Sequence, residues 1–159
     1  MLRDRHLVPL SRQHQHALAL CVRIRRALAG RSAADASRWE SEVAGAFAAE
    51  ISHHFAAEEQ VLFPALHTLP ALRPLVEELL SEHVRLRSQV AAAAEHRLGH
   101  KGLLELAETL SQHVRKEERR LFEPMQQHLP APAMARLGAD LERFFAARGL
   151  GSAACSLPP

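Results

Sequence analysis

The chain has 159 residues, and 20 Lys and Arg against 18 Asp and Glu give a formal net charge of +2. This length predicts one domain, and the hydrophobic fraction of 47% excludes the disordered and collagen-like classes. The balanced charge provides no basic surface for nucleic acid, and no apolar run approaches the roughly 20 residues of a membrane span. The only two cysteines, Cys21 and Cys155, exclude a disulfide framework and a four-cysteine zinc site.

The use of histidine points to metal chemistry. The chain has 11 His but no Tyr, and imidazole is the side chain that most often binds transition metals. The first 16 residues lack the apolar core of a signal peptide, so we expect a cytoplasmic protein.

Apolar residues recur at helical spacing along almost the whole chain, and no stretch alternates as a strand does. The first helix is expected over residues 10–29, and Gly30 ends it. The second follows a capping box, Ser37 to Glu40, and runs to about residue 66. The third is expected over 74–98, the fourth over 103–128 and a shorter fifth over 132–148. This pattern predicts an all-α fold, an antiparallel up-down-up-down four-helix bundle with the short C-terminal fifth helix packed outside it.

Two of the predicted helices carry the same pattern, H-x-x-x-E-E-x-x-L-F. It begins at His54 and again at His113. The other two long helices each carry a candidate histidine without a glutamate four residues later, His14 after Leu10-Ser11 and His83 after Leu80-Ser81. Residues i and i+4 lie one turn apart on the same helix face, so a histidine and a glutamate at this spacing can reach one metal centre.

The expected positions of these residues along the helices agree. Glu58 lies about eight residues before the end of the second helix, and His83 about nine after the start of the third. At a rise of 1.5 Å per residue, the two heights agree to within a turn. Counting residues from the helix ends in the same way places His14, His54 and His113 at this level. The predicted metal ligands are therefore His14, His54, Glu58, His83, His113 and Glu117.

Four imidazoles and two carboxylates in a bundle core suit a pair of first-row metal ions, with iron as the first choice. Zinc or manganese could occupy the same ligands in recombinant material. The ferritin-like pattern needs two E-x-x-H motifs, and the chain has one, Glu50 to His53. The alternative to a metal site is a hydrogen-bonded polar layer in the core.

Several neighbouring residues stay open as participants. His16 competes with His14 but points about 200° away around the helix, and His14 shares the face of Leu10 and Leu18. Glu59 and Glu118 directly follow the two predicted glutamate ligands and are the reserve candidates, expected to be solvated or at a helix–helix seam.

These residues resemble the hemerythrin family, in particular its bacterial HHE cation-binding domains. The resemblance rests on His14, the HFAAEE run from His54, His83 and the HVRKEE run from His113. It implies a four-helix bundle at about residues 7–128 that holds a non-haem di-iron centre and binds dioxygen. We therefore expect a single domain over residues 1–148, a capping helix at about 132–148 and a flexible tail at 149–159.

One position departs from the oxygen carriers of this family. They have a second histidine one turn after the third-helix histidine, and here that position is Arg87. Two octahedral irons offer about twelve positions, of which the six residues and a bridging hydroxide would fill roughly ten. The two open positions argue against reversible carriage, and a more open centre could instead reduce peroxide or oxygen or bind iron reversibly. The leading expectation is a di-iron protein that binds dioxygen or a related small oxidant, for oxygen, iron or redox sensing or storage.

Two alternative functions stay open. One is reduction of peroxide or nitric oxide by the same centre, although the pattern favours a binding protein over an enzyme. The other is a metal-dependent interaction module. The expected partners are a small diatomic molecule or peroxide, with no nucleic acid and no membrane, and a homodimer is one option for the assembly.

Overall fold

The computed structural model describes residues 2–29 and 33–150, and this part of the chain is helical without any strand. The prediction of an all-α fold is confirmed. The predicted tail at 149–159 lies almost entirely outside the described residues. The longer helices are α1 (Val8–Leu28), α2 (Ala33–Ala46), α5 (Arg73–Ala94), α6 (Gly99–Lys116) and α8 (Ala131–Ala146).

Shorter elements extend α2 and α6 into long continuous runs. After α2 come the π-helical segment η1 (Phe47–Ile51), α3 (Ser52–Ala57), the π-helical η2 (Glu58–Leu62) and α4 (Phe63–Ala65). After α6 come the π-helical η5 (Glu117–Phe122) and α7 (Glu123–His128). Two short 3₁₀ turns, η3 (Leu66–Thr68) and η4 (Pro70–Leu72), lead into α5. Residues 2–29 and 33–150 thus form four long helical runs and α8.

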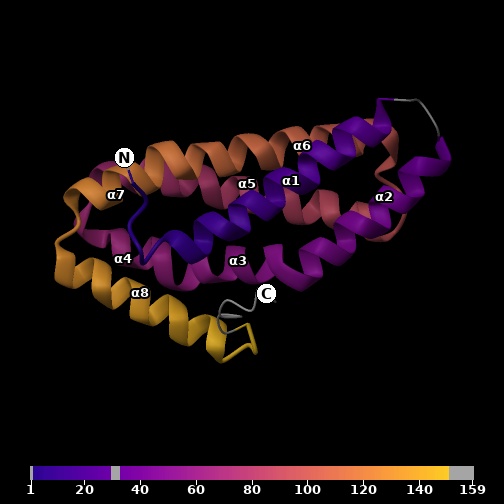
Figure 1. Ribbon diagram of the computed structural model, residues 1–159. Coiled ribbons are helices and arrows are strands. Elements are labelled where there is room, and N and C mark those ends of the chain that lie inside the picture. The colour runs from indigo at the N-terminus through magenta and orange to yellow at the C-terminus, as the bar shows by residue number, and fades with distance from the viewer. Residues whose placement is uncertain (1, 30–32, 151–159) are drawn as a thin grey trace.

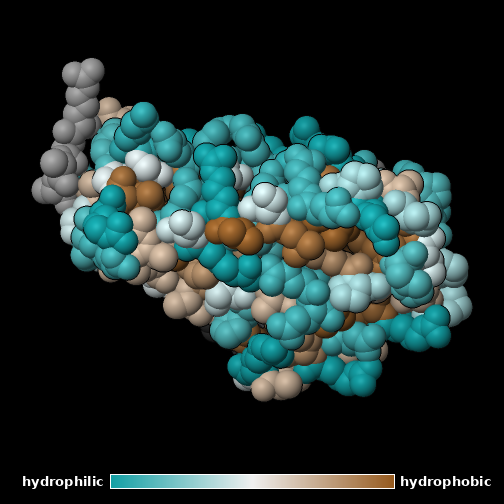
Figure 2. Space-filling view, turned by 180° about the vertical axis from the view of Figure 1, so that it is seen from behind, coloured by the Kyte–Doolittle hydropathy of each residue, from teal (hydrophilic) through white to brown (hydrophobic). Residues whose placement is uncertain are grey.

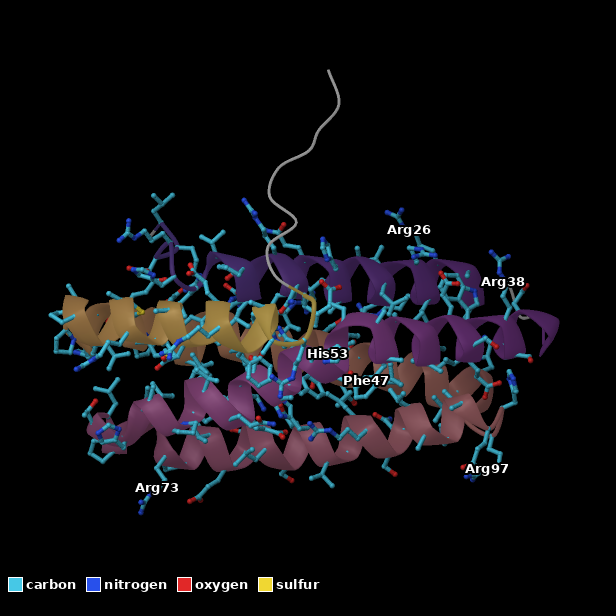
Figure 3. All side chains as sticks on the ribbon, turned by 90° about the horizontal axis from the view of Figure 1, so that it is seen from below. Arg26, Arg38, Phe47, His53, Arg73 and Arg97 are labelled. Atoms are coloured by element: carbon cyan, nitrogen blue, oxygen red, sulfur yellow. The ribbon has the colours of Figure 1, made fainter. Side chains whose placement is uncertain are left out.

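The four runs lie lengthwise beside one another, and α8 lies against the outside of α3 and η2 (Figure 1). Figure 3 shows the same arrangement from below, with the labelled side chains of Arg26, Arg38, Arg73 and Arg97 pointing away from the helices. All four of these arginines are exposed. The charged side chains therefore cover the outside and the apolar faces meet inside.

The predicted start of the second helix is wrong. This helix begins at Ala33, so Ser37 lies inside it, and the Ser37 hydroxyl hydrogen-bonds with His96 Nδ1 at 3.1 Å. Glu40 is buried and caps a different helix, because its Oε1 accepts the N–H groups of Leu98 and Gly99, both at 2.8 Å. A local capping box and a long-range cap use the same residue types, and the sequence alone does not distinguish them.

The core consists of two apolar clusters, one at each end of the bundle. The cluster near α8, here the α8-end cluster, is built around Leu7, Leu10, Leu62, Leu79, Leu121, Phe122, Met125, Leu137 and Phe145. The cluster near α2, here the α2-end cluster, is built around Leu20, Ile24, Trp39, Val43, Phe55, Leu86, Leu103, Leu106 and Leu110. Between the two clusters lies a layer of buried polar side chains.

The surface is mostly hydrophilic. Seen from behind, it carries a lengthwise band of hydrophobic residues (Figure 2). Within the described residues, none of the helices has both the length and the hydropathy that a bilayer crossing requires.

Candidate metal centre

The polar layer is formed by six buried side chains, contributed by all four helical runs. None of them is more than 4% exposed. They form two overlapping groups of four, and in each group one ligand atom per residue lies within 4.8 Å of all the others. The first group is His14, His54, Glu58 and Glu117, and the second is His83, His113, Glu58 and Glu117. These are the six residues that the sequence pattern singled out.

The histidines face each other in two pairs. His14 Nε2 lies 2.9 Å from His54 Nε2, and His83 Nε2 lies 3.1 Å from His113 Nε2. Two nitrogens that bind one metal ion at about 2.1 Å and at a right angle lie roughly 3.0 Å apart. Each pair therefore has the spacing of two neighbouring ligands of one octahedral ion.

Each carboxylate has one oxygen beside each histidine pair. Glu58 Oε1 lies 3.1 Å from His54 Nε2, while its Oε2 lies 3.3 Å from His83 Nε2. Glu117 Oε2 lies 3.1 Å from His14 Nε2, and its Oε1 lies 3.2 Å from His113 Nε2. Such an arrangement suits carboxylates that bridge two ions.

The same four oxygens are left without hydrogen bonds. Although the nitrogen atoms around them are close, no donor among the described residues has the geometry of a hydrogen bond to Glu58 or Glu117. A polar layer held together by its own hydrogen bonds would satisfy these buried acceptors. The donor set therefore fits a pair of cations better than a metal-free polar core.

The outer nitrogen of every histidine is held by an oxygen. Nδ1 of His14 lies 2.7 Å from Glu118 Oε1, and Nδ1 of His83 lies 2.8 Å from Glu59 Oε1. Nδ1 of His54 and of His113 each lie 2.8 Å from an oxygen, that of Gln13 and that of Glu82 respectively. These oxygens only accept, so each Nδ1 carries its hydrogen, and the lone pair of each neutral Nε2 points into the layer.

π-Helical turns begin at both glutamates of the layer. In η2 the N–H of Phe63 bonds the carbonyl of Glu58, five residues back. The segment η5 begins at Glu117, the equivalent position of the repeated pattern. A π turn holds one more residue than an α turn, and such turns concentrate at functional sites. Leu62 and Phe63, four and five residues after Glu58, are both buried.

Aromatic rings close the layer on both sides. The ring of Phe55 stacks on His83 at a centroid distance of 3.8 Å, and that of Phe122 stacks on His14 at 5.4 Å. Phe63 also lies over His83, at 5.9 Å. These rings restrict the imidazoles and exclude water from the carboxylates.

In the absence of a bound cation, the electrostatics of the layer favour protonated histidines. Burial acts to lower the pKa of His14, but Glu117 and Glu118 outweigh it and raise this pKa to about 9. Burial acts in the same way on His113, where Glu117 and Glu82 raise the pKa to about 10. Because every Nδ1 already donates, an additional proton on one Nε2 accounts for the short nitrogen–nitrogen contact in each pair. Two protons then compensate the two buried carboxylates.

The six residues lie in a segment of the chain that matches a known protein family. Residues 7–125 match the family model described as the hemerythrin HHE cation binding domain. This segment covers most of the chain and contains all six residues. The chain belongs to the hemerythrin HHE family. Neither the curated proteins nor the solved structures gave a match.

Cation binding is thus the property that this hemerythrin-family chain shares with its family, and the buried His/Glu clusters are where it can hold metal. The resemblance found in the sequence is confirmed at the family level. The structure brings all six predicted residues together, and their action as ligands is part of the proposal below.

The other residues that the sequence left open as participants in the site of this hemerythrin-family chain lie outside the layer. His16 is exposed on the surface, where its Nδ1 lies 3.0 Å from Glu50. The guanidinium of Arg87 binds the carboxylate of Glu59, with Nη1 2.7 Å from Oε1, and does not enter the cluster. Glu59 and Glu118 are half-buried and accept hydrogen bonds from His83 and His14. Of the two expected locations, in solvent or at a helix–helix seam, both glutamates take the second, because each contacts a histidine of another helix.

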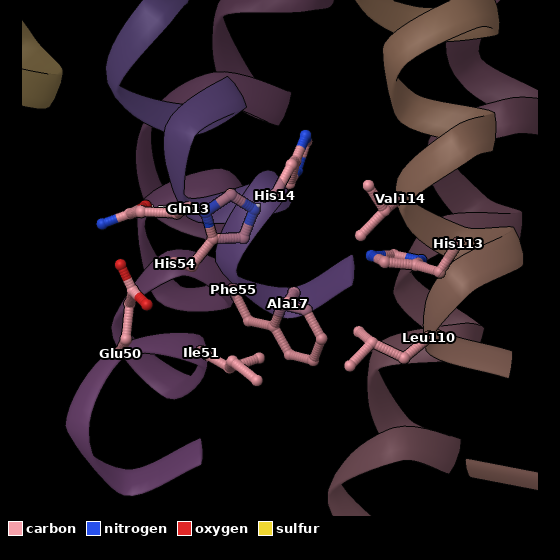
Figure 4. A pocket seen from close by; sticks show the side chains of 10 residues that line it. All are labelled: Gln13, His14, Ala17, Glu50, Ile51, His54, Phe55, Leu110, His113 and Val114. Carbon is pink, nitrogen blue, oxygen red and sulfur yellow. Dashed lines mark hydrogen bonds between the residues drawn. The ribbon is translucent and has the colours of Figure 1, made fainter. Parts of the chain in front are cut away.

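A small cavity adjoins the layer on the side of the α2-end cluster (Figure 4). Its volume is about 10 Å³, which is about the space of one water molecule. Figure 4 shows His14 and His54 close together on one side and His113 on the other, with Phe55 between them. Gln13 and Glu50 lie at its outer edge, and Ile51 and Leu110 form part of its apolar lining.

Sequence reasoning missed Gln13 and Glu82, and it kept Glu59 and Glu118 as reserve ligands without assigning them the role of orienting a histidine. Gln13 and Glu82 each precede a histidine of the layer, and Glu59 and Glu118 each follow a glutamate of the layer. A signal was present, since each one adjoins a predicted ligand and the E-E doublet occurs twice. The signal is ambiguous because a neighbour in a helix points about 100° away, toward either solvent or the next helix.

Proposed function

We propose that this protein is a non-haem di-iron protein of the hemerythrin type that binds dioxygen or a related small oxidant. One observation supports this most strongly: each buried carboxylate places one oxygen beside each histidine pair and makes no hydrogen bond. Two cations would satisfy these oxygens, and the match to a cation-binding family agrees.

In this proposal His14 and His54 hold one ion, His83 and His113 hold the other, and Glu58 and Glu117 bridge them. Two irons, when bound, supply electrons and open coordination positions for a small oxidant. The oxygens on the Nδ1 atoms fix the ring orientations. The stacked phenylalanines keep the layer dry and limit the approach of larger molecules.

The size of the cavity supports a small ligand. A space of about 10 Å³ beside His14, His54 and His113 holds about one water-sized molecule, so only a very small ligand can lie beside these histidines. Arg87 stands where oxygen carriers have a further histidine, and its pairing with Glu59 keeps it out of the layer. Sensing or storage therefore stays the favoured role over reversible carriage.

The architecture is part of the proposal. Contacts between α1 and α6, α2 and α5, and α5 and α6 support an antiparallel up-down-up-down bundle, and the contacts of α8 with η2 and α3 support a capping fifth helix. We propose a single domain over residues 1–148, with the bundle at about 7–128, in a cytoplasmic protein.

Metal content and visible absorption test the proposal. The full chain is purified anaerobically, reconstituted with ferrous iron and exposed to air. About two irons per chain and a new visible band after air support a di-iron centre. Absence of bound iron after reconstitution would overturn it.

Matched variants locate the site. His54→Ala is expected to lower the iron content below two per chain, and Glu117→Ala to remove bridging and both irons. His53→Ala is the control, because His53 adjoins His54 in the chain but lies outside both clusters. Full iron retention in His54→Ala and Glu117→Ala would contradict the assignment.

The second candidate function is reduction of peroxide or nitric oxide at the same centre. The cavity beside three of the four histidines favours it, because a small substrate fits there. Steady, iron-dependent consumption of peroxide would support this function, whereas binding without turnover would exclude it.

A further inference from the structure

The polar layer repeats itself, together with the contacts that surround it. The repeat relates His14 to His83, His54 to His113 and Glu58 to Glu117. The contacts of the first half have counterparts in the second. Glu118 accepts from His14 at 2.7 Å, as Glu59 accepts from His83 at 2.8 Å. Arginines complete both contacts, Arg3 on Glu118 and Arg87 on Glu59.

One pair of equivalent contacts differs in charge. Each is made by the residue that precedes the layer's histidine in α1 or α5. Gln13 Oε1 accepts from His54 Nδ1 at 2.8 Å, and Glu82 Oε2 accepts from His113 Nδ1 at the same distance. The distances are equal, so the two histidines are oriented equally well. The difference is a neutral amide behind one and a carboxylate behind the other.

Lys116 contacts Glu82 and also Glu78. Glu78 is contacted in addition by Arg120 at 3.6 Å, so two cations face two carboxylates. The carboxylate of Glu82 still accepts the hydrogen of His113 Nδ1 directly, where Gln13 presents a neutral amide to His54. A carboxylate that accepts the outer N–H of an imidazole makes the other nitrogen more basic and strengthens its bond to a metal. An amide oxygen does this less, because it carries only a partial charge.

We propose that the two ion positions are unequal: the position of His83 and His113 fills first and holds its ion tightly, whereas that of His14 and His54 is weaker and exchanges its ion. Gln13 and Glu82 are the positioning residues that set this difference. The inference rests on the proposed function, since it assumes the two ion positions.

The cavity provides a second, independent observation. It is lined by both histidines of the weaker position and by Gln13, but of the other pair only by His113 (Figure 4). An ion at the weaker position is therefore the one that a small ligand reaches. At the tight position, the rings of Phe55 and Phe63 both lie over His83, at centroid distances of 3.8 and 5.9 Å.

Anaerobic titration of the metal-free full chain with Co²⁺, followed by calorimetry and visible absorption, tests the inference. The wild-type chain is expected to bind two ions in two steps with different dissociation constants. Gln13→Glu keeps the acceptor and adds the charge, and it is expected to tighten the weaker step by about 10- to 100-fold. Glu82→Gln is expected to weaken the tighter step by a similar factor.

Two further variants identify which position fills first. His54→Ala is expected to retain the tight step and lose the weak one, whereas His83→Ala is expected to lose the tight step. Gln15→Glu is the control for added charge, because Gln15 is exposed on the same helix. Helicity measured by circular dichroism verifies that each variant folds.

The outcomes separate the inference from the proposed function. Two equal steps in the wild-type chain, or unchanged steps in both Gln13→Glu and Glu82→Gln, would overturn the inequality and leave the two-ion centre intact. Absence of Co²⁺ binding in the wild-type chain would overturn the proposed function itself.

Discussion

The two apolar clusters and the polar layer between them differ in how their buried atoms are satisfied. In the clusters, side chains such as Leu79 and Leu106 are at most 2% exposed and gain their stability from packing against one another. In the layer, Glu58 and Glu117 are fully buried without a hydrogen bond. Burying such a group costs free energy. The clusters therefore stabilise the fold, whereas the layer lowers the free energy of unfolding in order to place these side chains together.

The largest expected effect follows from making the layer resemble the clusters. Glu58→Leu combined with Glu117→Leu should abolish binding of both ions, because both bridging groups are gone. The free energy of unfolding of the metal-free protein should fall by about 3–5 kcal/mol, because the change removes the carboxylate partners of the buried histidines and leaves the histidines in place. An unchanged or higher stability would contradict the protonated histidine pairs. Iron content and urea unfolding measure the two effects.

The control for this variant carries the same change on the surface. Glu77 and Glu123 are exposed, and their double replacement by Leu should leave the iron content unchanged. A strong loss of stability in the layer variant would show that the carboxylates contribute to folding as well as to the site.

The next prediction concerns the α2-end cluster, in which a smaller side chain should leave a cavity. Leu106 is 2% exposed in the α2-end cluster, and Leu106→Ala should lower the free energy of unfolding by about 2–5 kcal/mol because it leaves a cavity. The iron content should remain that of the wild type, since the layer is untouched. Leu80→Ala is the matched control, because Leu80 is 38% exposed. Equal losses in the two variants would contradict the role of the cluster.

The pH dependence of stability distinguishes the layer from the clusters without any mutation. In the metal-free protein the pKa of His14 is raised from 6.5 to about 9 and that of His113 to about 10. A raised pKa stabilises the fold below the unfolded value and loses this contribution as the pH rises through the folded value. The metal-free protein should therefore lose stability between about pH 6.5 and 10.

Metal binding should remove this loss of stability at high pH, because the bound ions replace the protons on His14 and His113. Uptake of two ions at pH 7 should release up to about two protons per chain from His14 and His113. Calorimetry in buffers of different ionisation enthalpy counts them. A metal-free stability that stays flat up to pH 10, or metal uptake without proton release, would contradict the protonated histidine pairs.

The smallest effect is expected at the surface. Arg23 Nη2 lies 2.7 Å from Glu42 Oε1, with side chains 57% and 42% exposed. Glu42→Gln should change the free energy of unfolding by less than about 1 kcal/mol, because water and salt screen such pairs. Thermal unfolding at low and high salt measures this, and a larger loss would show that the pair belongs to the core.

The helices and the six residues of the layer could be predicted because they depend on local spacing. A histidine and a glutamate four residues apart share a face in any helix, and the pattern from His54 recurs at His113. The contacts that depend on a second helix could not be predicted. Glu40 caps α6, 58 residues away, and Glu118 reaches His14 across 104 residues. The π-helical turns were not predicted either, because no residue type marks the position at which a helix accommodates an extra residue.

The π-helical turns have a consequence for the length of the repeated pattern. Residues on both sides of η2 are fixed, because His54 belongs to the layer before it and Phe63 packs in the α8-end cluster after it. Deleting one residue within η2 would remove the extra residue of the π turn and leave an ordinary α turn, so His54 and Phe63 would keep their faces. In an α-helical part of the same run, by contrast, a deletion would rotate everything that follows by about 100° around the helix axis. The run should therefore tolerate the loss of exposed Gln60 better than the loss of a residue from one of its α turns.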